Sequence, residues 1–173
     1  MGSYGKSDFK IIRVKPTLST DAYAQGDVLF TSTEIPNAVI GNGGCSKLVA
    51  MFIMDKQDGA DDDTIFVFHQ NNTQQLGTIN ASADVSDSNL ETMKVTGVAF
   101  NDGSDASSGA HIDNARIQQV YPASGSNEDS FQLQFLQAED DSTSVYISGL
   151  NTGTSNPTFA DGDLELIFHI EYR

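Results

Sequence analysis

The sequence predicts an all-β protein, an antiparallel β-sandwich of jelly-roll type with about nine or ten strands and one short helix near 87–93. The last part of the chain alternates apolar and polar residues, most clearly over 164–172, as a strand with one buried face does. Glycine, serine, asparagine and aspartate cluster between short apolar runs, which is typical of turns between strands. No long helical pattern and no convincing internal repeat interrupts this series.

The first part of the chain is expected to hold three short strands before a glycine-rich turn. Residues 9–14 form the first strand, with odd-numbered residues on one face and even-numbered residues on the other. Pro16 ends it, because proline cannot donate to a ladder. A second strand begins at 28–30, and a third short segment covers 35–40. The tight turn at 41–44 then leads to the middle of the chain.

Two consecutive apolar runs, 47–54 and 64–69, organise the middle of the chain. Both are short and rich in β-branched or aromatic residues, so we predict two strands that pair as an antiparallel hairpin across an aspartate-rich loop. Neither run alternates, whereas a strand with one wet face should. Both faces of the hairpin therefore need cover, one from a second sheet and the other from a helix, a loop or another protein chain. The candidate contact residues are Met51, Phe52, Ile53, Phe66 and Phe68.

One short helix is expected over 87–93, with Ser86 or Asp87 as its N-cap. Leu90 and Met93 would face the core, and the helix would cover an end of the sandwich or part of the hairpin's second face. Further strands are expected over 95–100, 111–121, 131–135 (Phe131, Leu133 and Phe135 being the apolar positions), 145–148 and 164–172.

Length and composition limit the possible partners. A chain of 173 residues can bury a real core, and we expect one domain over 9–173 preceded by a flexible arm at 1–8. A net charge of −15 disfavours nucleic acid, whose phosphates attract lysine and arginine patches. No apolar run reaches the roughly 18 residues of a membrane helix, so no membrane partner is expected. The one cysteine, Cys45, is expected to be a buried structural thiol.

Carboxylates in the central loop are the one candidate cation site. Calcium prefers several oxygen ligands, but the spacing does not match an EF-hand loop, and a solvated turn is the competing interpretation. The candidate ligands are Asp55, Asp58, Asp61, Asp62 and Asp63. His69, His111 and His169 lie on different predicted strands without the spacing of a metal pair, so surface or packing roles are expected. With no nucleophile elbow and no phosphate-binding loop, we expect neither an enzyme nor a cofactor.

Several segments are similar to segments that recur in virion proteins of tailed bacteriophages. They are the stretch from Val14 to Phe30, its continuation from Glu34 to Val39, Leu76-Gly77-Thr78, Ser86-Asp87-Ser88, and Val145 to Leu150 followed by Gly162-Asp163-Leu164. The chain resembles this family from Val14 to its C-terminus. The resemblance implies a structural component of the virion, with capsid decoration (cement) as its role, and it implies no active-site residues.

The resemblance and the doubly apolar hairpin lead to one hypothesis. The chain would be a capsid decoration protein that stabilises the assembled shell, with the major capsid protein as partner and a homo-oligomer (dimer or trimer) as its state. Its acidity favours the outer capsid surface of the virion, away from packaged DNA. The alternative is a host-recognition or carbohydrate-binding β-sandwich of a fibre or adhesin. Exposed aromatics such as Tyr121, Tyr146 and Phe159 would then have to cluster on loops, and the lack of tryptophan argues against it.

Overall fold

A computed structural model of the chain describes residues 8–56, 63–101, 109–112, 115–122 and 134–172. Within these residues the chain forms ten strands and one helix, which confirms the predicted all-β class. The strands are β1 (Phe9–Val14), β2 (Val28–Ile35), β3 (Cys45–Asp55), β4 (Thr64–His69), β5 (Val95–Asn101), β6 (Gly109–Ile112), β7 (Ala115–Pro122), β8 (Gln134–Gln137), β9 (Val145–Asn151) and β10 (Leu164–Tyr172). The helix is α1 (Asp87–Met93).

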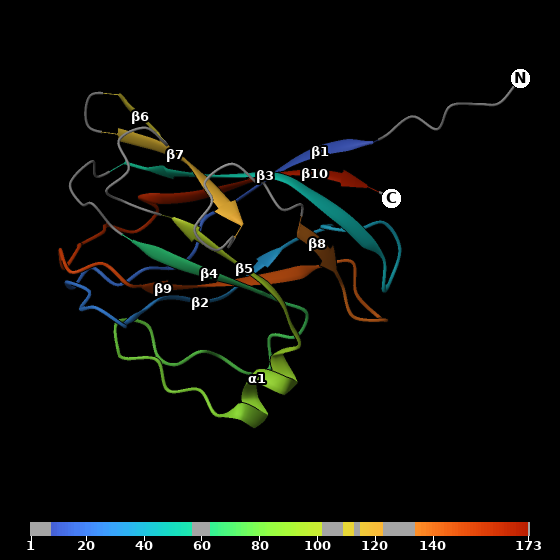
Figure 1. Ribbon diagram of the computed structural model, residues 1–173, viewed down its shortest axis with the longest axis horizontal. Coiled ribbons are helices and arrows are strands. Elements are labelled where there is room, and N and C mark those ends of the chain that lie inside the picture. The colour runs from blue at the N-terminus through green and yellow to red at the C-terminus, as the bar shows by residue number, and fades with distance from the viewer. Residues whose placement is uncertain (1–7, 57–62, 102–108, 113–114, 123–133, 173) are drawn as a thin grey trace, which may run out of the picture.

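Eight of these strands form two antiparallel sheets that pack face to face (Figure 1). We call β1-β10-β3-β7 the upper sheet and β5-β4-β9-β2 the lower sheet. Along the chain β1 pairs with β10, β2 with β9, β3 with β7, and β4 with β5. This nested pairing is that of a long antiparallel ribbon wrapped over itself, so the predicted jelly roll is confirmed. β6 pairs with β7, β8 pairs with β3, and a short β5–β7 pairing joins the sheets.

The predicted hairpin of 47–54 with 64–69 is wrong. β3 pairs with β10, β7 and β8, whereas β4 pairs with β5 and β9 in the other sheet. The chain crosses from the upper sheet to the lower sheet between β3 and β4, so these two neighbours in sequence lie on opposite sides of the core. The two runs are apolar on both faces because each is a central strand of its sheet, and this composition says nothing about which strand lies beside it.

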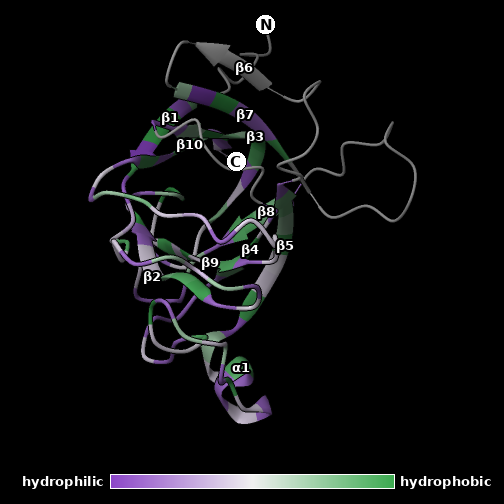
Figure 2. Ribbon diagram, turned by 90° about the vertical axis from the view of Figure 1, so that its left-hand side faces the viewer, coloured by the Kyte–Doolittle hydropathy of each residue, from purple (hydrophilic) through white to green (hydrophobic). Residues whose placement is uncertain are grey.

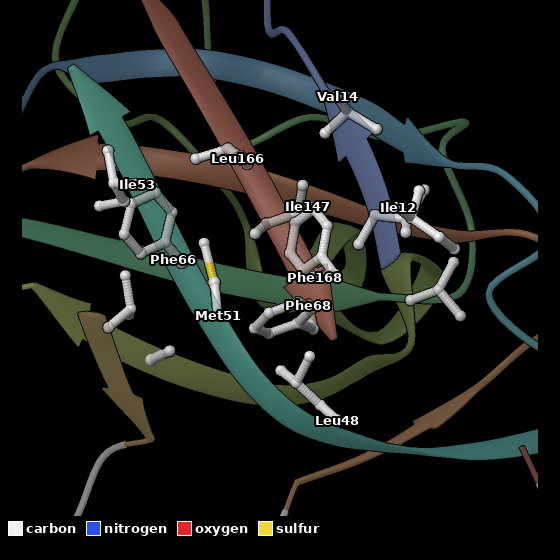
Figure 3. Close-up of a cluster of buried hydrophobic side chains, with 14 of the residues drawn as sticks. Ile12, Val14, Leu48, Met51, Ile53, Phe66, Phe68, Ile147, Leu166 and Phe168 are labelled. Carbon is white, nitrogen blue, oxygen red and sulfur yellow. The ribbon is translucent and has the colours of Figure 1, made fainter. Parts of the chain in front are cut away.

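The inner faces of the two sheets form one core, shown in Figure 3. Phe66 and Phe68 of β4 and Phe168 of β10 lie in this core, with the Phe68 and Phe168 rings edge-on at 6.2 Å between centroids. Each of these rings is fully buried. Burying a side chain of this size stabilises the fold by about 1.5–3 kcal/mol relative to leaving it exposed.

The helix has the predicted bounds, 87–93, and begins at the predicted cap. The Ser86 hydroxyl accepts a hydrogen bond from the Asn89 N–H at 3.3 Å, which satisfies one free amide of the first turn. Lys94 ends the helix in the left-handed conformation, with φ of 52°. Met93 is buried as predicted, but Leu90 is 37% exposed and does not face the core.

Three strand predictions need correction. The segment 35–40 is no separate strand, because Ile35 ends β2 and turns follow it. The strand at 111–121 is divided into β6 and β7. In β8 the inward residue is Leu136, which pairs with buried Ser46, while Phe135 is 52% exposed; the remainder of 131–135 before Gln134 lies outside the described residues.

Of the predicted arm at 1–8, only Asp8 lies within the described residues. Its carbonyl oxygen accepts a hydrogen bond from the Tyr172 N–H at 3.0 Å, which ties Asp8 to the end of β10. The prediction of a flexible arm concerns residues outside the described ranges.

Candidate contact surface

The chain's own segment 70–94, which contains α1, covers the outer side of β4 and the start of β2 in the lower sheet. Val98 and Phe100 of β5, in the same sheet, are 37% and 44% exposed. Figures 1 and 2 both place α1 beyond this sheet, on the side away from the core. A second apolar cluster forms there, in which Leu76 and Met93 pack on Val67 of β4 and Val28 of β2. All four side chains are at most 8% exposed. The second apolar face of β4 therefore finds its cover within the same polypeptide, as one of the predicted alternatives.

His69 fixes this covering segment to the sheet. Its ring is fully buried, with Nδ1 at 2.9 Å from the Asn71 carbonyl oxygen and Nε2 at 3.0 Å from the Ser148 hydroxyl. A carbonyl can only accept, so Nδ1 carries the proton and donates, and the neutral Nε2 accepts from Ser148. Burial lowers the pKa of His69, although the Asn71 hydrogen bond opposes this. The ring also stacks on Tyr146, with 6.0 Å between centroids.

An ion pair fixes the end of the covering segment. The Lys94 ammonium lies 2.6 Å from Oε1 of Glu139, and the Asn71 side-chain amide donates to Oε2 of the same carboxylate at 3.0 Å. The hydrogen bond to Lys94 lowers the pKa of Glu139. A solvent-exposed pair of this kind contributes little energy, so its role is to set the position of the loop.

On the outer face of the upper sheet, Phe9 and Ile11 are more exposed than the described apolar side chains of the lower sheet. We call the surface formed by Phe9, Ile11, Phe52, Ile167 and His169 the β1 face. Phe9 is 67% exposed and Ile11 is 58% exposed. The strand register places Ile11 beside His169, and Ile167 beside Phe52, whose ring lies 5.2 Å from that of His169. The five side chains are thus neighbours across β1, β10 and β3, with Phe9 and Ile11 exposed, Phe52 and His169 half-buried and Ile167 only 8% exposed.

Ion pairs border the β1 face. Arg13 on β1 reaches Glu165 on β10 at 3.2 Å, and Lys47 on β3 reaches Glu171 on β10 at 3.6 Å. An apolar centre within a charged rim is the usual composition of a protein–protein contact surface.

Four of the five predicted contact residues lie in the core, so they are not available as contact residues. Met51, Ile53, Phe66 and Phe68 are all at most 4% exposed and point between the sheets (Figure 3). Phe52 is half-buried and belongs to the β1 face. The alternation of β3 sends Phe52 outward and its neighbours inward, an alternation hidden in the sequence because both faces are apolar.

The sequence could have indicated the β1 face from β1 itself. The odd-numbered residues include Phe9 and Ile11, while the even-numbered residues include the buried Ile12 and Val14. A strand that is apolar on both faces needs a packing partner on each face. This pattern occurs at 9–14 as well as in the central runs.

The aspartate-rich loop lies only partly within the described residues. Asp55 is 8% exposed at the end of β3, in register with Arg116 on β7. Asp63 is exposed, and its carbonyl oxygen accepts from the Thr152 N–H at 2.8 Å. The candidate ligands Asp58, Asp61 and Asp62 lie outside the described residues. Among the residues that the structure places, no group of three or more histidine, cysteine, aspartate or glutamate side chains could hold a metal ion.

The histidines lie on different strands, as predicted. His69 is on the outer side of β4, His169 is on the β1 face of the other sheet, and His111 is on β6. Cys45 is exposed, so the prediction of a buried thiol is wrong. β3 instead turns Ser46 inward, where its hydroxyl donates to the Ala38 carbonyl oxygen at 2.7 Å.

The aromatic residues named for a carbohydrate site do not gather on loops. Phe159 is 5% exposed and packs edge-on against buried Tyr23, at 5.9 Å between ring centroids. Tyr146 is a half-buried residue of β9 that stacks on His69. The side chain of Tyr121 lies outside the described part of the chain.

Comparisons with known proteins add little to this geometry. A chain from a solved structure of deformed wing virus carrying the GFP gene is similar over 95% of this chain and 75% of that chain, with 8% identity and a TM-score of 0.36. A likeness this low carries no inference about function. No protein-family model matches the chain, and no curated protein matches it. The resemblance to tailed-phage virion proteins is therefore not supported by a match to a protein family. In the described ranges, no helix has the length and apolar character needed to cross a membrane.

Proposed function

We propose that the chain is a structural protein of a virion, which decorates the outer capsid surface and stabilises the assembled shell by contacts with the major capsid protein. The observation that carries the proposal is the β1 face, on which Phe9 and Ile11 are more than half exposed. Soluble monomers rarely expose contiguous apolar patches of large side chains, and such patches commonly mark contacts with other polypeptides.

Two further observations support the kind of partner. The chain carries a net charge of −15, which favours a shell surface over packaged nucleic acid. The resemblance of the segments from Val14 onward to tailed-phage virion proteins supplies the capsid as the assembly. Capsids repeat their contacts around symmetry axes, so the proposal includes a dimer or trimer as the state on the particle.

Co-sedimentation with capsids tests the proposal. Purified protein is mixed with capsids of the virus whose genome encodes it, the capsids are pelleted, and bound protein is measured against its concentration. The proposal predicts saturable binding at a fixed number of copies per shell, and decorated shells that survive more heat or lower ionic strength than bare shells. Protein that stays in the supernatant at all concentrations would contradict it, and binding to a glycan array instead would favour the host-recognition alternative.

A further inference from the structure

The ends of the folded sheet are β1 and β2, and the described residues of the chain cover only β2. Along the open side of β2, the Ser32 N–H donates to the Gln75 side chain at 2.7 Å. Nearer its start, the Val28 N–H donates to the Ala81 carbonyl oxygen, and the Val28 carbonyl accepts from the Asn80 N–H, both at 2.9 Å. This is how natural proteins prevent an edge strand from pairing with another chain.

The edge of β1 has no such cover among the described residues. The Tyr172 N–H donates to the Asp8 carbonyl oxygen at 3.0 Å, so these two residues form a hydrogen-bonded pair. Such pairs alternate along an antiparallel ladder, which directs the main-chain groups of Lys10 and Ile12 toward β10. The N–H and C=O groups of Phe9 and Ile11 therefore point away from β10. Within the described ranges, no main-chain hydrogen bond beyond the β10 ladder is made by β1.

The side chains along this edge define what could pair with it. Phe9 and Ile11 stand on the outer face of the same edge, while Lys10, Arg13 and Lys15 are exposed. Residues 1–15 hold four lysine or arginine residues and one aspartate, a net of +3. The rest of the chain holds five basic and 23 acidic residues, a net of −18. A basic, apolar edge therefore borders a strongly acidic body.

We propose that the free edge of β1 takes up an extended segment of a partner polypeptide as an added strand, and that this segment alternates apolar residues with aspartate or glutamate. Main-chain hydrogen bonds to the edge supply affinity in this mode, and alternate side chains supply specificity. A second copy of β1 is a poorer occupant, because it would place two segments that each carry a net charge of +3 side by side, and like charges on neighbouring strands destabilise a sheet. The inference deepens the proposed function and rests on it for the identity of the polypeptide as a capsid protein.

A peptide-binding experiment on the full chain tests the proposal. The probe is a short, labelled peptide of alternating valine and glutamate with blocked ends, and the control peptide has lysine in place of glutamate. The glutamate peptide should bind at least about tenfold more tightly than the lysine peptide, because charge complementarity selects the partner. Ile11→Pro removes an edge N–H that β10 does not use, so it should weaken binding by about tenfold or more. Ile11→Thr keeps that N–H and should weaken binding less.

Three outcomes would overturn the proposal. They are equal binding of the two peptides, absence of binding, and unchanged binding by a folded Ile11→Pro variant. If that variant does not fold, hydrogen exchange on the wild-type protein decides instead, since the amides of Phe9, Ile11 and Arg13 should become protected when the glutamate peptide is added. Self-association of the wild-type protein that Ile11→Pro abolishes would also overturn it, by assigning the edge to a second copy.

Capsid co-sedimentation separates this inference from the proposed function. Equal capsid binding by the wild-type protein and by Ile11→Pro would overturn the strand-addition inference and leave decoration standing. Binding of the glutamate peptide without any capsid binding would support the edge and overturn decoration.

Discussion

The outer sides of β4 and β1 differ in how far other segments of the chain cover them. On the lower sheet, Val67 and His69 of β4 are buried under the segment that carries Met93. On the upper sheet, Phe9 and Ile11 of β1 are 67% and 58% exposed. Both strands are apolar on two sides, so the difference lies in whether the chain returns to cover the second side. The segment 70–94 returns across β4, whereas none of the segments that the structure describes returns across the outer side of β1.

This contrast shows what an apolar strand can and cannot reveal. Burying one large apolar side chain contributes about 1.5–3 kcal/mol, which the chain gains at Val67 and does not gain at Phe9. Because Phe9 and Ile11 stay exposed in the folded chain, burying them against a binding partner would contribute that free energy to binding instead. The proposed contact surface therefore lies on β1, β10 and β3, whereas β4 carries the structural cover.

The largest expected difference in the free energy of unfolding is between phenylalanine truncations on the two faces of the upper sheet. Phe168→Ala empties a fully buried position between the sheets and should lower the free energy of unfolding by about 3–5 kcal/mol. Phe9→Ala, the same substitution on the exposed face, should change it by at most about 0.5 kcal/mol. Chemical denaturation of both variants measures the difference. Similar losses for the two would mean that Phe9 is covered in solution.

The next largest effect concerns the cover of the lower sheet. Met93→Ala removes the fully buried methionine that holds α1 on β4, and it should cost about 2 kcal/mol, the lower end for such a truncation, because the cluster is small. Ile11→Ala on the uncovered face should leave stability within about 0.5 kcal/mol of the wild type. Equal unfolding midpoints for Met93→Ala and the wild type would show that the segment 70–94 does not stabilise the sheet.

A smaller effect is expected at the helix cap. Ser86→Ala removes the acceptor for the Asn89 N–H and should cost about 1 kcal/mol, whereas Ser86→Gly should cost a few tenths. Hydrogen exchange should show the loss as faster exchange of the α1 amides, while the β3 and β10 amides stay protected. Faster exchange throughout the core would contradict the separation of cover and core.

The smallest expected effect on the free energy of unfolding at neutral pH is that of His69 protonation, and this effect grows as the pH is lowered. Burial lowers the pKa of His69 in the folded chain below its ordinary value of 6.5, so below that value the unfolded chain binds a proton that the folded chain does not. The free energy of unfolding should thus fall as pH falls below 6.5, down to the folded pKa. Denaturation at about pH 7.5 and about pH 5 measures this, with His69→Gln as control. The same pH dependence in both proteins would exclude His69 as its source.

Much of the fold could be predicted from local pattern. The bounds of β1 and α1, the N-cap at Ser86 and the alternation of β10 follow from proline, capping and period-two rules, which depend on nearby residues alone. The jelly roll itself followed from the number of short strands and the absence of other patterns. These features are local or statistical, so a single sequence carries them.

For the central strands, the sequence could not predict which strands pair with one another or which side chains point into the core. A run apolar on both faces gives no period, so the sequence could not distinguish inward Met51 from outward Phe52, or show that β3 and β4 lie in opposite sheets. The prediction that Cys45 is buried was wrong because the strand register, and not the polarity of the side chain, decides which residue of β3 faces the core. The register turns the polar Ser46 inward and leaves Cys45 exposed. Four of the residues predicted for contact are buried in the core, and the contact surface that we propose lies on β1, β10 and β3 instead.

The most direct test of the account compares two exposed phenylalanines on opposite sheets. Phe9 stands on the β1 face, and Phe100, 44% exposed, stands on β5 beside Ile65 on the outer side of the lower sheet. Capsid affinity is measured by co-sedimentation for Phe9→Ser and for Phe100→Ser. Truncating a central contact residue weakens binding by about tenfold or more, so the account predicts that loss for Phe9→Ser and wild-type affinity for Phe100→Ser. Full affinity in Phe9→Ser, or an equal loss in both variants, would contradict the assignment of the contact surface to β1, β10 and β3.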